Sequence, residues 1–152
     1  MILTKRGRIA LGIAIALLAG SVSFVLVRTF TGGPSCTPPA RLETRHGVTL
    51  EPGAMQAFRR AESLAGRRIH VVQSYRSCAG QALACQRVCG DSAGCPGTCA
   101  EPGTSYHQRG KAIDVTRAML EAPRVVAALR KAGWCQSVPD SDPGHYSFDG
   151  CH

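Results

Sequence analysis

The chain has 152 residues, which is enough for one domain, and its composition lies within the range of globular proteins. The formal net charge of +8 is concentrated at the start, because residues 1–28 contain four basic residues and no acidic ones. Residues 29–152 therefore carry 14 basic and 10 acidic side chains, or +4, and few aromatic residues. This mild and scattered charge does not favour a nucleic-acid partner.

An uncharged apolar run at residues 9–27 is the first predicted element, and residues 1–8 form a short tail before it. As a helix the run spans roughly 28 Å, close to the hydrocarbon thickness of a bilayer. Three basic residues precede it and one closes it, which predicts a cytoplasmic N-terminus and a domain outside the cytoplasmic membrane, periplasmic or extracellular. A cleaved signal peptide, and hence a secreted protein, is the alternative. The run is longer than the usual ~7–15 apolar residues, so we expect a retained single-pass anchor.

A linker is predicted at residues 28–50, because its first part is rich in glycine, proline and serine. The folded domain is expected at residues 51–152. Its first helix begins at Pro52 and ends at Gly66, with apolar residues at helical spacing between them. Further along the chain, strands are predicted in RIHVVQS (68–74), KAIDV (111–115) and HYSF (145–148), and helices at 75–90 and 122–133.

All eight cysteines follow the apolar run. An even, dense set in a small exported domain predicts disulfides, although eight cysteines allow 105 pairings and the sequence assigns none. One hypothesis is a disulfide between Cys135 and Cys151 that fixes the segment around His145. The alternative to disulfides is a structural zinc site formed by Cys85, Cys89, Cys95 and Cys99. The Cys-x3-Cys spacing of these residues fits zinc less well than Cys-x2-Cys.

His107 and Asp114 lie seven residues apart, and neither a helix nor a straight strand brings them to one metal ion. The chain must fold back between them, and Gly110 is suited to that bend. His145 offers a third ligand, and Asp142 lies three residues before it. Two imidazoles and one carboxylate would leave a position open for water, which is typical of catalytic zinc. Asp142 would then accept a proton from that water.

Arg76 follows a predicted strand within the sequence SYRS. Its permanently charged guanidinium is suited to stabilising a developing oxyanion, or to binding a substrate carboxylate.

These motifs resemble a known family. The sequence SYRS with Gln81 downstream, SYHQRGKAID matching Ser-x-His-x-x-Gly-x-Ala-x-Asp, and DPGH matching acid-x-x-His are similar to the VanY-like zinc D-alanyl-D-alanine carboxypeptidases and peptidoglycan endopeptidases. The resemblance extends over about residues 51–148. It implies an α+β fold in which a small antiparallel sheet with packed helices cradles the zinc, and it implies peptidoglycan stem peptides as substrates.

The resemblance also implies the roles of single residues. Zinc would be bound by His107, Asp114 and His145. The general base would be Asp142, and Arg76 would stabilise the carbonyl or oxyanion. Substrate binding is expected of Gln81 and of Ser105, and Ser105 would alternatively support the site from behind the ligands.

Two departures from the family pattern stand out. Carboxypeptidase members usually have glutamate as the base, whereas here the residue is Asp142, followed by Pro143 and Gly144. Members that cut the L-Ala–D-Glu bond do use aspartate, so both bonds stay open. A catalytically silent wall-binding module with the same fold is the second hypothesis. The other departure is the cysteine density, which we interpret as stapling of a small core. The sequence does not predict the oligomeric state.

Overall fold

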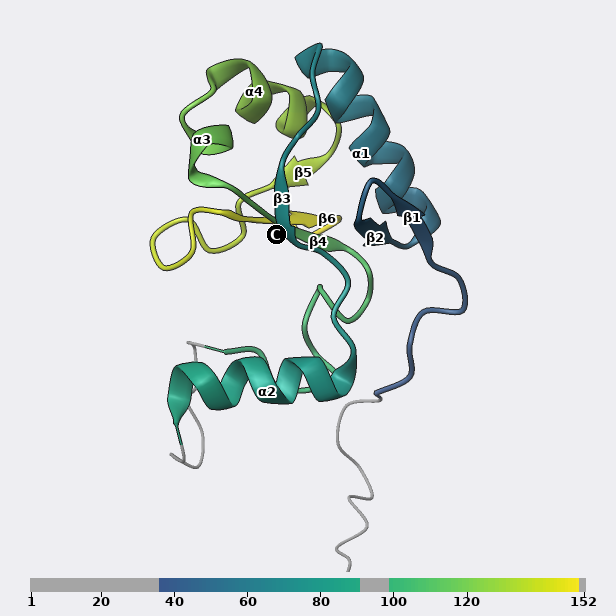
Figure 1. Ribbon diagram of the computed structural model, residues 1–152, viewed down its shortest axis with the longest axis vertical. Coiled ribbons are helices and arrows are strands. Elements are labelled where there is room, and N and C mark those ends of the chain that lie inside the picture. Colours follow the sequence, from purple (N-terminus) through teal and green to yellow (C-terminus); the bar gives the residue numbers. More distant parts are fainter. Residues whose placement is uncertain (1–35, 91–98, 151–152) are drawn as a thin grey trace, which may run out of the picture. The chain divides into compact units, whose positions relative to one another are not determined.

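The computed structural model describes residues 36–90 and 99–150 of the chain (Figure 1). They belong to one compact unit, Gly32–His152. The predicted tail and membrane helix at residues 1–27 lie outside the described residues. None of the helices in the described ranges combines the length and the hydrophobicity that a membrane span requires.

A four-stranded antiparallel sheet forms the centre of the fold. Its strands lie in the order β3 (Val71–Gln73), β4 (Ala112–Val115), β6 (His145–Phe148) and β5 (Trp134–Cys135). Strands β3, β4 and β6 fall within the three runs that the sequence predicts. Strand β5 has only two residues and was not predicted, because so short a strand leaves no periodic pattern. The expected α+β fold with a small antiparallel sheet is confirmed.

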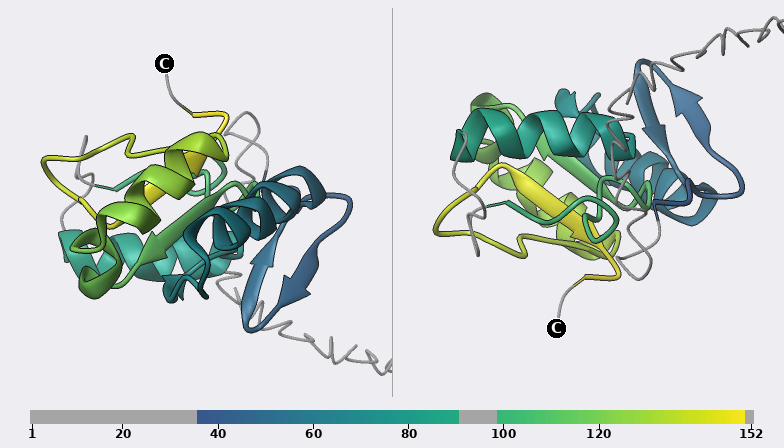
Figure 2. Two further views of the ribbon diagram at one scale, coloured as in Figure 1. Left: turned by 90° about the horizontal axis from the view of Figure 1, so that it is seen from above. Right: turned by 90° about the horizontal axis from the view of Figure 1, so that it is seen from below.

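Helices lie on both sides of this sheet (Figures 1 and 2). The helices α1 (Pro52–Ala65) and α4 (Pro123–Lys131) pack against each other on one side, next to the one-turn helix α3 (Arg117–Leu120). Helix α2 (Cys78–Cys89) lies on the other side. The predicted helices at residues 52–66, 75–90 and 122–133 are confirmed, with shorter bounds for the last two.

The ends of α1 are set by its sequence. The Glu51 side chain accepts hydrogen bonds from the backbone N–H groups of Gly53 and Ala54, at 3.1 and 2.7 Å, and so caps the first turn. Pro52 occupies the first helical position, where no N–H is needed. Gly66 ends the helix in the left-handed conformation, with φ of 68°.

The hydrophobic core lies between α1, α4 and the sheet. Alternation along β4 directs Ile113 and Val115 into this core, and Tyr146 on β6 pairs directly with Ile113. Trp134 is 1% exposed, as expected of a core residue. The other large side chains that are fully buried are Phe58, Leu50, Met55, Leu129 and Val125.

The linker prediction for residues 28–50 needs a correction at its C-terminal end. Residues 43–50 form a hairpin of β1 (Glu43–Arg45) and β2 (Val48–Leu50), joined by a two-residue turn in which His46 and Gly47 both have positive φ. Val48 and Leu50 are buried in the core. The apolar alternation of this strand therefore places it in the domain, and the domain begins before residue 51.

Disulfides connect α2 to two distant segments. Cys36 pairs with Cys78, and Cys85 pairs with Cys99. Cys89 is disulfide-bonded as well. The structural zinc site is therefore wrong, because thiols that are joined in disulfides cannot bind zinc as thiolates. Cys135 is also disulfide-bonded, but Cys151 lies outside the described residues, and their pairing stays a prediction.

Candidate metal centre

His107 reaches the sheet from a tight loop that ends at Gly110. Gly110 has φ of 67°, and its carbonyl accepts a hydrogen bond from the Glu51 N–H at 3.0 Å. A Cβ atom at this position would lie 2.7 Å from that same nitrogen, so only glycine fits. The bend expected at Gly110 is confirmed. It turns the chain so that the buried His107 ring faces strand β4.

Asp114 and His145 are direct cross-strand partners. They occupy opposite positions on the antiparallel strands β4 and β6, so their side chains leave the same face of the sheet. Because Ile113 and Tyr146 face the core, this face is the one opposite α1 and α4. The sheet register thus brings together two residues that are 31 positions apart in the chain.

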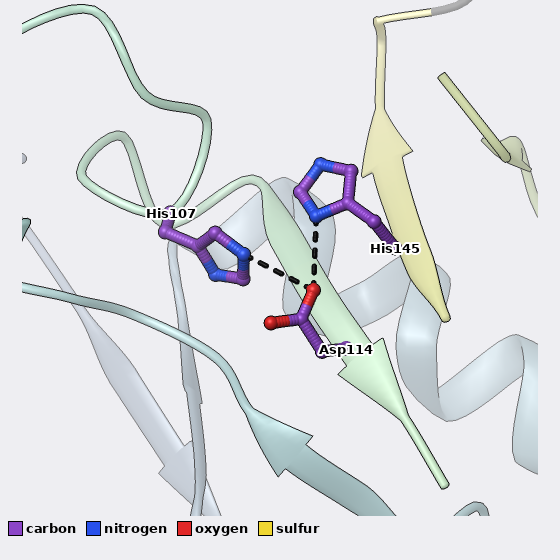
Figure 3. Close-up of side chains that lie close together, drawn as sticks. All are labelled: His107, Asp114 and His145. Atoms are coloured by element: carbon purple, nitrogen blue, oxygen red, sulfur yellow. Dashed lines mark hydrogen bonds and ion pairs between the residues drawn. The ribbon is translucent and has the colours of Figure 1, made fainter. Parts of the chain in front are cut away.

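The three side chains point at one another (Figure 3). One carboxylate oxygen of Asp114, Oδ1, lies 3.2 Å from His107 Nε2 and 2.9 Å from His145 Nδ1. One potential ligand atom from each residue lies within 4.8 Å of the others. The three residues that the sequence singles out as zinc ligands therefore converge.

Hydrogen bonds on the far side of each imidazole orient the two rings. His107 Nδ1 lies 2.7 Å from the Ser74 carbonyl oxygen, which can only accept, so Nδ1 carries the proton and Nε2 presents a lone pair to Asp114. His145 Nε2 lies 3.1 Å from the Ser147 hydroxyl, which leaves Nδ1 for the centre. In its neutral form the His107 ring directs a lone pair at the Asp114 carboxylate, and the two repel each other unless a proton or a metal cation lies between them. The donor set therefore fits zinc, with an outer hydrogen bond for each histidine.

The two histidines also change the acidity of Asp114. Burial raises the pKa of this carboxyl, but when no metal ion lies between the groups, the hydrogen bonds and charge interactions with His107 and His145 in their protonated forms lower it by more. The pKa of Asp114 therefore lies well below the ordinary value of an aspartate, and the group is a carboxylate at neutral pH. A ligand that is already ionised has no proton to lose when it binds a metal ion.

Arg76 lies beside this group. Its Nη2 atom is 3.9 Å from Asp114 Oδ2, and its backbone N–H donates to the His107 carbonyl at 3.2 Å. The side chain is 20% exposed, so it borders the solvent side of the centre. Two imidazoles, one carboxylate and one guanidinium thus occupy a single face of the sheet.

One family profile, described as VanY, D-alanyl-D-alanine carboxypeptidase, matches residues 49–139. The chain belongs to this family. The resemblance drawn from the three sequence motifs is confirmed, and with it the expectation of a D-alanyl-D-alanine carboxypeptidase-like enzyme. No curated protein matches the chain.

Two solved structures of VanY proteins are similar to this chain. One is VanYB in complex with D-alanine-D-alanine, with 21% identity, a TM-score of 0.51, and coverage of 76% of this chain and 83% of that chain. The other is a mutant of the vancomycin resistance D,D-pentapeptidase VanY from a VanB-type cassette in complex with Zn(II), with 21% identity, a TM-score of 0.52, and coverage of 76% and 82%. At this identity the likeness shows a shared fold.

The other site residues expected from the sequence, Ser105, Gln81 and Asp142, differ in burial and in the groups that they contact. Ser105 is buried, and its hydroxyl accepts a hydrogen bond from the His107 N–H at 3.3 Å, which supports the loop. The Gln81 amide oxygen accepts a hydrogen bond from Arg76 at 2.9 Å. Asp142 is exposed in the turn before β6, and its carbonyl accepts from the His145 N–H at 3.1 Å. In the described ranges, no hydrogen bond or ion pair joins the Asp142 carboxylate to the metal group.

Sequence reasoning did not single out two residues that contact the histidines of the metal group. Ser74 acts through its backbone carbonyl, which no side-chain pattern reveals. Ser147 is fully buried, and its hydroxyl lies between His145 Nε2 and the Ser137 hydroxyl, the latter at 2.9 Å. The spacing of two between His145 and Ser147 was a usable signal, because residues i and i+2 of a strand share a face.

Proposed function

We propose that the protein is a zinc-dependent hydrolase of peptidoglycan stem peptides that acts outside the cytoplasmic membrane. The bond cut is either the terminal D-Ala–D-Ala bond, as in a D,D-carboxypeptidase, or the L-Ala–D-Glu bond, as in an endopeptidase. The observation that carries the proposal is the convergence of His107, Asp114 and His145 beside Arg76. Membership of the VanY family supports it.

In this proposal His107 Nε2, Asp114 and His145 Nδ1 hold the zinc ion. Zinc bound in such a site polarises a carbonyl and lowers the pKa of a coordinated water to about 7. The Ser74 carbonyl and the Ser147 hydroxyl keep both rings in the orientation that binding needs. The two histidine rings are therefore ordered before the ion binds, and little conformational entropy is lost on binding.

Arg76 then acts on the substrate. Its guanidinium lies next to Asp114 and borders solvent, where the carbonyl oxygen of a bound peptide gains negative charge as it is attacked. A fixed cation at that position stabilises the developing charge, and removing one such group typically lowers kcat by about 10²–10³-fold.

Asp142 is the proposed general base. The His145 N–H donates a hydrogen bond to the Asp142 carbonyl, and this bond holds the turn that contains Asp142 next to a proposed metal ligand. A base must come within hydrogen-bond reach of the attacking water, and in proteins without substrate such contacts are often still open. We expect Asp142→Asn to lower kcat by about 10²-fold or more without changing zinc content. Asp140→Asn, in the same exposed loop, is the matched control.

The location outside the membrane rests on the charge pattern around residues 9–27 and on the disulfides. Disulfides such as Cys36–Cys78 and Cys85–Cys99 form and persist in oxidising compartments outside the cytoplasm. A fusion of alkaline phosphatase after residue 152 tests the location, since this reporter is active only outside the cytoplasm. An inactive fusion would contradict the proposed location.

The experiment that tests the activity is incubation of residues 32–152 with purified muropeptides, followed by mass spectrometry. We expect either released D-alanine or a cleaved L-Ala–D-Glu bond, and the mass difference identifies the bond. The protein should contain one zinc ion, and His107→Ala should contain none and be inactive. A zinc-free active protein, or full activity of His107→Ala, would refute the proposal.

A wall-binding module without activity is the second candidate, and the exposed Asp142 favours it. Such a module would bind muropeptides at micromolar affinity or better in calorimetry but leave their masses unchanged. Replacing Asp142 with glutamate separates the two candidates further. If aspartate merely places the base too far away, the longer side chain should raise the rate.

A further inference from the structure

Helix α2 is poorly anchored by hydrophobic contacts, although its residue Gln81 contacts Arg76, which lies beside the metal group. Among its 12 residues Gln81 is the buried one, and the apolar Leu83 and Val88 are 53% and 60% exposed. A helix without an apolar face toward the core has little packing to hold it. Its position depends instead on covalent links, one of which is Cys85–Cys99.

Gln81 connects this helix to Arg76. The side chain is 2% exposed, and its amide oxygen accepts a hydrogen bond from Arg76 Nη1 at 2.9 Å. The other end of the amide, Nε2, donates to the Ala100 carbonyl at 2.8 Å. Both ends of the amide are thus bound by protein atoms, and one of those atoms belongs to the catalytic arginine.

The disulfide fixes the acceptor at the far end. Ala100 directly follows Cys99, so the Cys85–Cys99 bond sets where its carbonyl lies relative to α2. The two sulfur atoms also flank the amide, at 3.6 and 3.5 Å from Gln81 Nε2. A continuous series of contacts therefore runs from the disulfide through Ala100 and Gln81 to Arg76.

We propose that Gln81 is a positioning residue that holds the Arg76 guanidinium toward the metal centre, and that the Cys85–Cys99 disulfide holds Gln81 in place. The inference rests on the proposed function, in which Arg76 acts on the substrate. Arginine has many rotamers, and a guanidinium that is fixed before the reaction loses less entropy in the transition state. Gln81 supplies that restraint from one side while Asp114 attracts the same group from the other.

A double-mutant cycle tests this. We expect Arg76→Met to lower kcat by about 10²–10³-fold and Gln81→Met by about tenfold or more, with zinc content unchanged. If Gln81 acts through Arg76, adding Gln81→Met to Arg76→Met should change kcat by less than about twofold. An equal loss in both backgrounds would mean that Gln81 acts elsewhere, and would overturn the proposal.

Gln108→Met is the matched control. Gln108 is also a buried glutamine near the site, and its amide oxygen accepts a hydrogen bond from the Gly103 N–H at 2.7 Å rather than from Arg76. Its effect on kcat should therefore be the same fold-change with and without Arg76. Coupling as strong as that of Gln81 would show that the cycle reports general damage.

The disulfide is tested by Cys85→Ala/Cys99→Ala, which keeps Gln81 and also serves where Gln81→Met does not fold. We expect a loss in kcat of roughly threefold to tenfold that disappears in the Arg76→Met background. No loss, or the same loss without Arg76, would remove the disulfide from the proposal.

Spectra of protein with ¹⁵N-labelled arginine separate this proposal from the proposed function. The Arg76 guanidinium should rotate slowly in the native protein and faster in Gln81→Met, whether or not the protein hydrolyses muropeptides. Slow rotation that persists in Gln81→Met would overturn the positioning role alone. An inactive native protein with restrained Arg76 would overturn the proposed function alone.

Discussion

Helices α1 and α4 on one side of the sheet, and helix α2 on the other, are held in place by different kinds of contact. The first pair buries large apolar residues such as Met55, Phe58 and Leu129 against the sheet. Helix α2 buries one glutamine and is joined to the chain by disulfides. Two of the three candidate metal ligands, Asp114 and His145, belong to the sheet, and His107 lies on the loop before β4, whereas the hydrogen bond that restrains Arg76 comes from α2. The proposed metal binding and the proposed positioning of Arg76 would therefore depend on parts of the protein with different sources of stability.

The largest expected effect comes from Asp114→Asn. The substitution keeps the shape of the side chain but removes the charge that both histidines and Arg76 face. We expect atomic absorption to show that zinc is lost, and the rate of hydrolysis to fall by at least about 10⁴-fold. A fall of this size is smaller than the total rate acceleration of a typical enzyme. Because Asp114 faces away from the core, circular dichroism should remain native. A zinc-loaded Asp114→Asn protein would contradict the ligand assignment.

Phe58→Ala tests the packed side of the comparison. Phe58 is 1% exposed, and removing a buried phenyl ring typically lowers the free energy of unfolding by about 3–5 kcal/mol. Leu83→Ala on α2 is the control, with an expected loss within about 0.5 kcal/mol because Leu83 is largely exposed. Urea denaturation measures both. Equal losses would mean that α2 is packed after all.

Removal of the Cys85–Cys99 disulfide tests the other side. For a loop of this length a disulfide contributes about 3 kcal/mol. In Cys85→Ala/Cys99→Ala we expect the amides of α2 to exchange clearly faster than in the native protein, while the amides of α1 stay protected by the unchanged core. Hydrogen exchange with mass spectrometry measures both helices in one experiment. Amides of α2 that stay as protected as those of α1 would contradict the comparison.

Gly110→Ala tests the connection between the His107 loop and α1, with a smaller expected effect. Its matched control is Gly66→Ala, because Gly66 has nearly the same φ but open space where a Cβ would lie. The left-handed conformation costs either alanine about 1–2 kcal/mol. The close approach of Glu51 N should cost Gly110→Ala about 1–3 kcal/mol more. Thermal unfolding measures the difference, and equal costs would mean that the loop yields easily.

Features with a local sequence signal were predictable. Helix α1 has a capping glutamate, a proline at its first position and a terminal glycine, and its bounds agree with the expectation within one residue. The metal group was predictable because two spaced motifs, SYHQRGKAID and DPGH, contain its three residues. The β1–β2 hairpin was missed because its turn, His46–Gly47, follows a segment rich in proline and glycine that is typical of a linker.

Features that depend on long-range pairing were not predictable. Eight cysteines allow 105 complete pairings, and the sequence does not single out those that contain both Cys36–Cys78 and Cys85–Cys99. The bond between Gln81 and Arg76 depends on where α2 lies, and that position is set by disulfides whose pairing the sequence leaves open. A motif thus identifies Gln81 as relevant without revealing which group it contacts.

The pairing of Asp114 with His145 across β4 and β6 has one more consequence. A slip of a single residue between these strands would turn one of the two side chains into the apolar interior and leave the other facing solvent. In the proposed enzyme, a misaligned chain therefore has no complete ion site and no hydrolytic power. Zinc would bind the correctly aligned state alone and would stabilise it by its binding free energy. The ion needed for catalysis would therefore also favour the correct register of these two strands.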